Sequence, residues 1–194
     1  MKRMILFATA NLHKLQEVQQ ILGPDYVVDI PANHGMTEDI PENEPTLEGN
    51  ALAKAQYVYD RLGIRCFADD TGLEVEALNG APGVISARYA GESKDAHANM
   101  RKLIEALQNQ SNRKARFRTV IAYVGDGGAE LFEGIVNGSI IDTPIGQEGF
   151  GYDPIFVPDG FEQSFAQMAA EEKNTMSHRG RAMQKLIDFI HGQD

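Results

Sequence analysis

Two adjacent carboxylates, Asp69 and Asp70, follow the apolar run Cys66 to Ala68 and precede Thr71-Gly72. The apolar run predicts a buried strand, so both carboxylates are expected at a strand end. Adjacent carboxylates in such a place are unfavourable unless a cation binds there. A few oxygen ligands suit Mg²⁺, which also uses water and phosphate oxygens. The same residues are equally typical of a turn, so this motif alone leaves a metal site and a turn open.

A second candidate is the segment Thr9-Ala10-Asn11-Leu12-His13-Lys14, between a predicted strand and a predicted helix. Free backbone N–H groups and the dipole at a helix start favour an anion such as a phosphate. Thr9 and Asn11 add short polar side chains, and Lys14 adds a positive charge. The alternative is an ordinary helix start with a solvated lysine. Taken alone, this segment favours that alternative.

Two further segments could contact a nucleoside. Phe150-Gly151-Tyr152-Asp153-Pro154 places aromatic rings beside glycine and a rigid proline, which suits base stacking, although core packing is the commoner use. Lys173, His178 and Arg179 gather near a helix start that Ser177 can cap. Cations are unfavourable at a helix N-terminus, so they are expected to face an anion or a base carbonyl, or else to be solvated.

The composition excludes several classes of function. The chain has 194 residues and a net charge of -10, so it is a poor general binder of nucleic acid or anionic membrane. The basic run Arg113–Arg118 is therefore expected to be a solvated or interface face. The single cysteine, Cys66, predicts a structural thiol and a fold without disulfides. The sequence has no phosphate-binding P-loop, dinucleotide fingerprint or zinc-protease motif. Separately, we expect a soluble cytoplasmic protein.

Helices and strands that would position these residues alternate along the first half of the chain. Apolar periodicity predicts strands at 3–8, 26–30, 66–68, 73–77, 116–124 and 131–140, and helices at 12–22, 46–62, 95–108 and 178–191. Thr46 is the expected cap of the second helix, and Gly125-Asp126-Gly127-Gly128 predicts a hairpin. Residues 31–45 and 142–154 are expected to be loops. The pattern predicts an α/β fold with a mixed sheet.

Taken together, these segments resemble the inosine triphosphate pyrophosphatase family, which acts on non-standard purine nucleoside triphosphates. The resemblance rests on five stretches in family order, which are TANLHK (9–14), ENEPTLEGNALAKA (42–55), FADDTGLEVEALNGAPGVISARYAG (67–91), FGYDPIF (150–156) and EEKNTMSHRG (171–180). It implies a single domain over residues 1–194, with an elongated mixed sheet flanked by helices and a nucleotide cleft between two lobes. It also implies a homodimer.

The resemblance assigns roles to individual residues. Asp70 is implied as the catalytic proton acceptor, and Glu42 and Asp70 as ligands of Mg²⁺ or Mn²⁺, with Asp69 as a further candidate. The implied substrate-binding residues are Thr9, Ala10, Asn11, Leu12, His13, Lys14, Lys54, Thr71, Phe150, Gly151, Tyr152, Asp153, Lys173, His178 and Arg179. The implied reaction is hydrolysis of ITP, dITP or XTP to the monophosphate and pyrophosphate, through attack by water on the α-phosphate.

The sequence also departs from the family pattern. Ala10 replaces a usual glycine, which disfavours a positive φ in the first loop. Asn43-Glu44 stand where Thr-Gly is usual, Gly49 stands where glutamate is common, and Thr71 replaces serine but keeps a hydroxyl.

Three other functions remain open from the sequence. A Maf-like pyrophosphatase would act on pyrimidine or modified nucleotides, a non-catalytic sensor would bind ITP without hydrolysis, and an RNA-binding module would use Arg113–Arg118.

Overall fold

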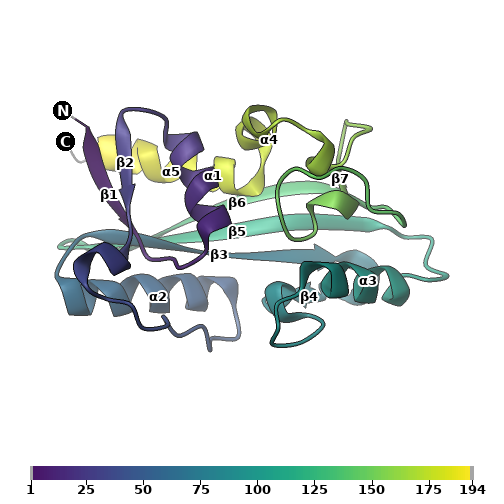
Figure 1. Cartoon of the computed structure of the whole chain (residues 1–194), viewed down its shortest axis with the longest axis horizontal. Helices are drawn as coiled ribbons and strands as arrows, with labels where there is room; N and C mark the ends of the chain where they lie inside the picture. Colours follow the sequence, from purple (N-terminus) through teal and green to yellow (C-terminus); the bar gives the residue numbers. More distant parts are fainter. Residues whose placement is uncertain (1, 193–194) are drawn as a thin grey trace. The chain divides into compact units, whose positions relative to one another are not determined.

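The computed structural model describes residues 2–192, and Figure 1 shows their helices around a mixed sheet. The principal elements are β1 (Arg3–Phe7), α1 (Leu12–Leu22), β2 (Tyr26–Asp29), α2 (Leu47–Leu62), β3 (Cys66–Val75), β4 (Pro82–Gly83), α3 (Ala96–Ala106), β5 (Lys114–Gly125), β6 (Gly128–Ile140), β7 (Phe156–Pro158), α4 (Ala170–Met176) and α5 (His178–His191). Within residues 2–192 the strands form one sheet in the order β2-β1-β3-β5-β6-β7, with β4 paired to β3. Strand β1 is parallel to β2 and β3, whereas β4 and β7 are antiparallel to β3 and β6. The predicted α/β fold with a mixed sheet is confirmed.

The ends of the early helices are capped by polar side chains and by glycine. The Asn11 side chain accepts hydrogen bonds from two backbone N–H groups in the first turn of α1. The Thr46 hydroxyl accepts one from the N–H of Gly49 at the start of α2. Gly63 ends α2 with a φ of 64°, a left-handed conformation that glycine adopts without a steric penalty.

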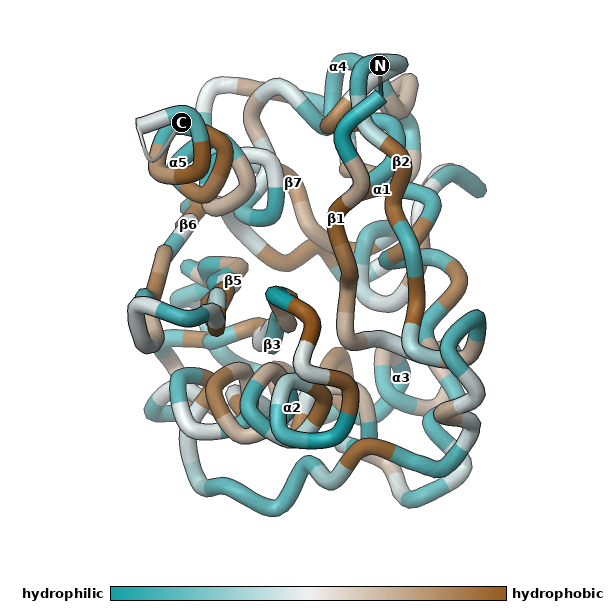
Figure 2. The backbone as a smooth tube through the Cα atoms, turned by 90° about the vertical axis from the view of Figure 1, so that its left-hand side faces the viewer, coloured by the Kyte–Doolittle hydropathy of each residue, from teal (hydrophilic) through white to brown (hydrophobic). Residues whose placement is uncertain are grey.

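The chain divides into two compact units. The first comprises the residues up to Asp70, Thr119–Gly134 and the residues from His178. Its core is apolar and comes from β1, α1, β2, β3, β5 and α5, with the buried members Ile5, Phe7, Val18, Leu22, Tyr26, Phe67, Ile121, Tyr123, Ala182, Met183 and Leu186. In Figures 1 and 2, α2 and α5 lie on opposite sides of β3, and Figure 2 shows the apolar stretches of β1 and β2. This core fixes the strand and helix ends that carry most of the predicted phosphate-side residues.

The second unit comprises Thr71–Arg118 and Ile135–Ser177. Its core joins the end of β3 to α3, β5, β6 and the aromatic segment around β7, with the buried members Leu73, Val75, Met100, Leu103, Leu107, Ala115, Phe117, Val136, Ile140, Tyr152, Ile155, Phe156, Phe165 and Met168. The rings of Phe117, Phe156 and Phe165 contact one another, with centroids 4.6 to 6.1 Å apart. The predicted base-side loop is therefore anchored on an aromatic core.

Strand β3 corrects one sequence prediction. The strand does not end at Asp69-Asp70, and the turn that the sequence left open there is absent, because β3 continues without a break from Cys66 to Val75. Glycine at position 72 lets β4 approach β3 closely, since a Cβ there would lie 2.6 Å from the carbonyl oxygen of Gly83. The two carboxylates therefore lie in the middle of a buried strand, where their charges require partners.

Other differences lie in segments that the periodicity left irregular. The expected loop 31–45 begins with a 3-10 helix at Pro31–His34, and Met36 after it is buried. Short β7 and α4 were not predicted, because neither is long enough to give a periodic signal. Ser177, with extended dihedral angles of -67° and 160°, separates α4 from α5. Among residues 2–192, no helix combines the length and the apolarity that crossing a bilayer requires.

Candidate active site

Asp69 is a buried carboxylate of the first unit that pairs with two cations. Its side chain is 2% exposed, and its Oδ1 accepts a hydrogen bond from Lys14 Nζ at 3.0 Å. Its Oδ2 accepts two more from Arg179, from Nε at 3.2 Å and from Nη2 at 3.1 Å. Burial opposes ionisation, but the charges of Lys14, Arg179 and Lys54 outweigh it and hold the pKa of Asp69 well below its usual range. Asp69 is therefore ionised, with its oxygens bonded to protein cations.

Asp70 has a different environment on the next residue of β3. Its Oδ2 accepts a hydrogen bond from Asn50 Nδ2 at 2.9 Å, and its Oδ1 lies 4.0 Å from Lys54 Nζ. Burial raises the pKa of Asp70, and the nearby lysines and the bond from Asn50 only partly offset that effect. Neighbouring carboxylates with pKa values displaced in opposite directions are suited to different roles, with Asp70 the better proton acceptor.

Lys54 connects these carboxylates to the acidic loop that precedes α2. Its ammonium lies 2.5 Å from Glu42 Oε1 and 2.7 Å from the backbone carbonyl oxygen of Asp69. Burial lowers its pKa, but the charges of Glu42, Asp70 and Asp69 more than compensate, so the pKa is raised. Lys54 thus carries a fixed positive charge between Glu42 and Asp70, two of the residues that were expected to act together.

The loop before α1 differs in one respect from the expectation. The N–H groups of His13 and Lys14 donate to Asn11 Oδ1 at 3.0 and 3.2 Å, and the N–H of Asn11 donates to Thr9 Oγ1 at 3.0 Å. These N–H groups are therefore not free for an anion, and that prediction is wrong for them. The positive end of α1 and the Lys14 ammonium remain as the electrostatic attraction for phosphate. Burial lowers the pKa of Lys14, partly offset by Asp69.

Arg179 belongs to this carboxylate cluster. It is 1% exposed, and besides Asp69 it donates through Nη1 to Glu17 on α1. Arg179 thus faces anions, but they are the protein's own carboxylates, and Lys173, which was expected to converge with it, bonds to Asp153 in the second unit instead. His178, also buried at the start of α5, lies in the same unit.

In the second unit, Asp153 organises the aromatic loop. Its Oδ2 accepts hydrogen bonds from the N–H of Phe150 at 2.9 Å and from Lys173 Nζ at 2.7 Å. The Lys173 ammonium also lies 5.5 Å from the Phe150 ring centroid. Phe150, Asp153 and Lys173, which the sequence predicted as base-side residues, therefore do form one cluster.

Tyr152 and Thr71 have different positions in that unit. Tyr152 is 5% exposed, and its hydroxyl donates to the carbonyl oxygen of Ser86 at 2.7 Å. Ser86 Oγ in turn accepts from the N–H of Leu73 on β3 at 2.9 Å. Tyr152 therefore secures the loop, whereas the half-buried Phe150 is the better candidate to contact a base. Thr71 follows Asp70 directly on β3 and is half-buried.

The residues present are compatible with a divalent cation that a substrate also binds. Within residues 2–192, no three His, Cys, Asp or Glu side chains gather closely enough to hold a metal ion by themselves. Mg²⁺ is commonly held by one or two carboxylates together with water and substrate phosphates. Glu42 and Asp70 supply two carboxylates around one ammonium, whereas the bonds of Asp69 to Lys14 and Arg179 make it the weaker candidate ligand.

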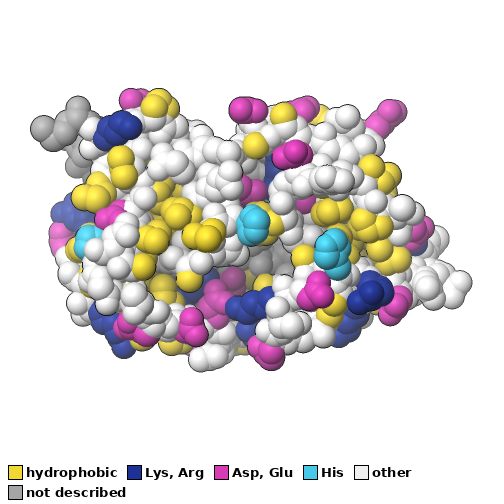
Figure 3. Space-filling model, viewed as in Figure 1, with side chains coloured by type: hydrophobic (Ala, Val, Ile, Leu, Met, Phe, Trp, Pro, Cys, Tyr) yellow, Lys and Arg dark blue, Asp and Glu magenta, His cyan; other side chains and the backbone are white. Residues whose placement is uncertain are grey.

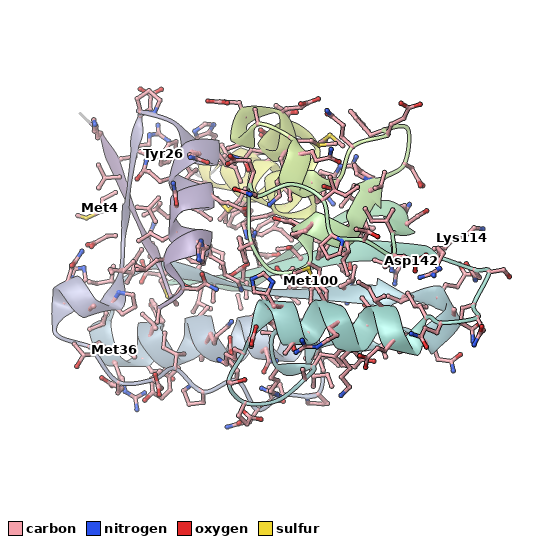
Figure 4. The ribbon with its side chains drawn as sticks, turned by 45° about the vertical axis from the view of Figure 1, so that its right-hand side comes forward. Met4, Tyr26, Met36, Met100, Lys114 and Asp142 are labelled. Atoms are coloured by element: carbon pink, nitrogen blue, oxygen red, sulfur yellow. The ribbon has the colours of Figure 1, made fainter. Side chains whose placement is uncertain are left out.

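The basic run at 113–118 is largely neutralised. Arg116 Nε lies 2.6 Å from Glu74, and Arg113 pairs with Asp142. Figure 4 shows Lys114 and Asp142 at the same end of β5 and β6. On the face drawn in Figure 3, acidic and basic side chains are interspersed. These pairings reduce the positive charge of the run, and its use as an interface or solvated face stays a prediction.

Two departures from the family pattern prove compatible with the fold. Within residues 2–192, the non-glycine residues with positive φ are Asn79, Lys94 and Asn109, so Ala10 needs no left-handed conformation. A Cβ at Gly49 would lie 2.8 Å from the Cβ of Glu44, so the side chain of Glu44 occupies the space that a side chain at position 49 would need. Cys66 is buried, and burial raises the pKa of its thiol to about 12, which fits the predicted structural role.

Sequence reasoning missed two polar residues of the site. Glu17 and Asn50 are 9% and 2% exposed, and they bind Arg179 and Asp70 respectively. Their signal in the sequence is spacing, since Glu17 lies three residues after Lys14, and Asn50 lies four before Lys54, so each pair shares one helix face.

Known proteins resemble this chain over nearly its whole length. A model of the Ham1 family matches residues 5–189. A protein from Porphyromonas gingivalis named dITP/XTP pyrophosphatase is 54% identical over 188 residues, covering 96% of this chain and 96% of its own length. A protein of the same name from Flavobacterium johnsoniae is 50% identical over 186 residues, covering 96% of this chain and 97% of its own length. The solved Staphylococcus aureus Ham1 protein has a TM-score of 0.89 and 39% identity, covering 99% of this chain and 100% of that one. The Coxiella burnetii HAM1 protein has a TM-score of 0.88 and 35% identity, covering 98% and 99%. This chain belongs to the Ham1 family.

Proposed function

We propose that this protein hydrolyses the non-standard purine nucleoside triphosphates ITP, dITP and XTP to the nucleoside monophosphate and pyrophosphate. Its relatives at 50–54% identity are named dITP/XTP pyrophosphatases. The observation that carries the proposal is the pairing of Asp70, whose pKa burial raises, with the fixed ammonium of Lys54 beside it. This combination supplies a proton acceptor and positive charge in one place, as hydrolysis of an anionic anhydride requires.

The cations of the first unit lower the electrostatic barrier to attack. A triphosphate is strongly anionic, so a negatively polarised water oxygen is repelled as it approaches phosphorus. Lys14, held by Asp69, and Lys54, held by Glu42, supply positive charge whose position is set before substrate binds. Such preorganised charge stabilises the transition state more than mobile solvent does. We assign these lysines to the triphosphate, with Thr9 to Lys14 as its binding loop.

Asp70 acts as the proton acceptor for water that attacks the α-phosphorus in line with the departing pyrophosphate. Burial and the raised pKa make its carboxylate a stronger base than an exposed aspartate. Asp69 cannot replace it efficiently, because three hydrogen bonds from cations stabilise its ionised form. Asp70 therefore serves proton transfer, whereas Asp69 positions Lys14.

Glu42 and Asp70 would hold a divalent cation, which we assign as Mg²⁺ with Mn²⁺ as a substitute. When bound with substrate, such an ion screens phosphate charge and favours deprotonation of water. Glu42 and Asp70 would supply its carboxylate ligands. Lys54 bonds to Glu42 and Asn50 bonds to Asp70, and these bonds hold the two carboxylates in place.

The second unit is assigned to the purine base. Phe150 presents an aromatic ring for stacking, and Asp153 fixes both the Phe150 backbone and Lys173. Acceptance of a carbonyl at purine position 6 requires a donor there, and refusal of GTP requires discrimination at position 2. Polar groups left unpaired by the wrong base can give discrimination of about 10⁴–10⁵-fold. Thr71, Gly151 and Tyr152 complete the proposed nucleoside set of this unit, and His178 and Arg179, which belong to the first unit, stay predicted nucleoside contacts.

Hydrolysis of ITP in ¹⁸O-labelled water tests the position of attack. Attack at the α-phosphorus places the label in IMP and leaves pyrophosphate unlabelled. Label in pyrophosphate would mean attack at the β-phosphorus, and release of IDP with phosphate would mean cleavage of the bond between the β- and γ-phosphates. Either result would contradict the mechanism. The nucleotide cleft between two lobes, the homodimer and the cytoplasmic location stay predictions.

A further inference from the structure

Asn50 occupies an unusual place for an amide side chain. It lies in the first turns of α2, is 2% exposed, and is followed by the buried alanine Ala51. Asparagine is a poorer helix former than alanine, and a buried amide must have its hydrogen bonds satisfied. A buried asparagine on a helix face that also carries the buried Leu47 and Lys54 therefore implies a specific polar contact.

The contacts of Asn50 join the acidic loop to the strand of the aspartates. Its Oδ1 accepts from the backbone N–H of Glu44 at 2.9 Å, and its Nδ2 donates to Asp70 Oδ2 at 2.9 Å. One turn later on the same helix, Lys54 faces the other oxygen, Asp70 Oδ1, at 4.0 Å. Helix α2 thus holds the two carboxylate oxygens of Asp70 from two positions four residues apart.

The direction of the hydrogen bond determines the orientation of Asp70. An amide nitrogen is a donor only, and the Glu44 N–H requires an acceptor, so the amide of Asn50 has one favourable orientation. With Oδ2 bound to Asn50, twisting of the Asp70 carboxylate would break that bond, so Oδ1 stays directed toward Lys54. Partners that orient a ligating or catalytic carboxylate usually affect function without touching the reacting atoms.

We propose that Asn50 is a positioning residue that fixes the rotation of the Asp70 carboxylate, and so presents Oδ1 to the attacking water and the divalent cation. This role rests on the function proposed above. It gives Asn50 a part in the reaction that is separate from its support of the acidic loop through Glu44.

Paired substitutions on one helix test this role. Asn50→Ala removes both hydrogen bonds. Gln56→Ala is the matched control, because Gln56 on the same helix donates its amide to a carboxylate of Asp60 at 2.7 Å on the exposed face. Titration of the nucleotide-free protein with Mn²⁺ measures cation affinity without any turnover. The account predicts about a 10-fold weaker Mn²⁺ affinity for Asn50→Ala and no change for Gln56→Ala.

Kinetics with ITP at saturating Mg²⁺ provide the second reading. For Asn50→Ala we expect kcat to fall about 10- to 100-fold, whereas KM for ITP changes little, because the phosphate and base contacts are untouched. Asn50→Asp separates the two contacts, since its carboxylate still accepts from Glu44 but cannot donate to Asp70. It should lose kcat to a similar degree, with Gln56→Glu as its control, and it carries the test if Asn50→Ala fails to fold.

Wild-type Mn²⁺ affinity and kcat in Asn50→Ala, or wild-type kcat in Asn50→Asp, would overturn the proposal. Failure of the wild-type protein to release pyrophosphate from ITP would instead refute the proposed function, and the Mn²⁺ titration would still decide the role of Asn50.

Discussion

Arg179 donates two hydrogen bonds to a single carboxylate oxygen of Asp69, at 3.2 and 3.1 Å, although the two residues lie 110 positions apart in the chain. The other oxygen of Asp69 is bonded to Lys14 at 3.0 Å. The start of α5 therefore fixes, through one aspartate, the lysine of the proposed phosphate loop. This relationship explains why a positively charged residue stands at a helix N-terminus, where it is otherwise unfavourable.

Asp69→Asn should destabilise the protein by about 3–5 kcal/mol in the free energy of unfolding, because it leaves the buried Arg179 and Lys14 without their shared counter-charge. Urea unfolding at pH 7 measures the change. Asp126→Asn is the control, since Asp126 pairs with Arg65 on an exposed surface and should change stability little. Equal small effects of both substitutions would contradict the assignment of Asp69 as a structural tether.

The stabilising effect of Asp69 should also disappear in acid. Its pKa in the folded protein is held below the unfolded value of about 3.9, so ionised Asp69 contributes its full stabilisation above that pH. That contribution is lost as the pH falls through the folded-state pKa. The stability difference between wild type and Asp69→Asn should therefore be constant from pH 7 to 5 and shrink below about pH 4. Unfolding curves across this range measure it, and a difference that grows in acid would refute the account.

Asp70→Asn should lower activity strongly without lowering stability, unlike Asp69→Asn. Because burial raises the folded-state pKa of Asp70 above its unfolded value, the ionised carboxylate destabilises the fold at neutral pH, and a neutral amide removes that penalty. We expect kcat to fall about 10²–10⁴-fold while Tm stays equal or rises. Steady-state kinetics with ITP and a thermal melt measure the two quantities. A variant that keeps most of its kcat would show that Asp70 is not the proton acceptor.

Gly72→Ala tests the reinterpretation of the Asp69–Gly72 segment as a continuous strand. An added Cβ would lie 2.6 Å from the carbonyl oxygen of Gly83, so β3 and β4 would have to separate. Overpacking of this kind costs about 1–3 kcal/mol. Gly127→Ala is the control, because a Cβ there meets no atom within 4 Å. If Gly72→Ala were as stable as Gly127→Ala, the close approach of the two strands would be wrong.

Periodicity and capping residues predicted the longer elements, because each of those signals is local. Thr46 and Gly63 marked the ends of α2, and Gly125–Gly128 marked the hairpin between β5 and β6. The continuous β3 could not be predicted from Asp-Asp-Thr-Gly, since its burial depends on cations from α1, α2 and α5. The charges of Lys14, Lys54 and Arg179 become partners of Asp69 and Asp70 only in three dimensions.

In the candidate site, too, residue types could be predicted from the sequence, whereas the partners that meet in the folded chain could not. The acidic and basic residues were identifiable from their types, but their partners were not, since Arg179 bonds to Asp69 and Glu17 in the first unit, whereas Lys173 bonds to Asp153 in the second. Glu17 and Asn50 were not identified, because single polar residues on apolar helix faces resemble ordinary surface positions until burial is known. The resemblance to a family implies the reaction, whereas the different hydrogen-bond partners of Asp69 and Asp70 support the division of roles proposed for them.

Product analysis with ITP and Mg²⁺, run beside ATP and GTP, tests the central claim most directly. The account predicts equal amounts of IMP and pyrophosphate from ITP, with little turnover of ATP or GTP. Binding of ITP without turnover would contradict the enzymatic account and favour a nucleotide sensor. Neither binding nor turnover of ITP, with hydrolysis of pyrimidine or modified nucleotides instead, would contradict the assignment to purine triphosphates.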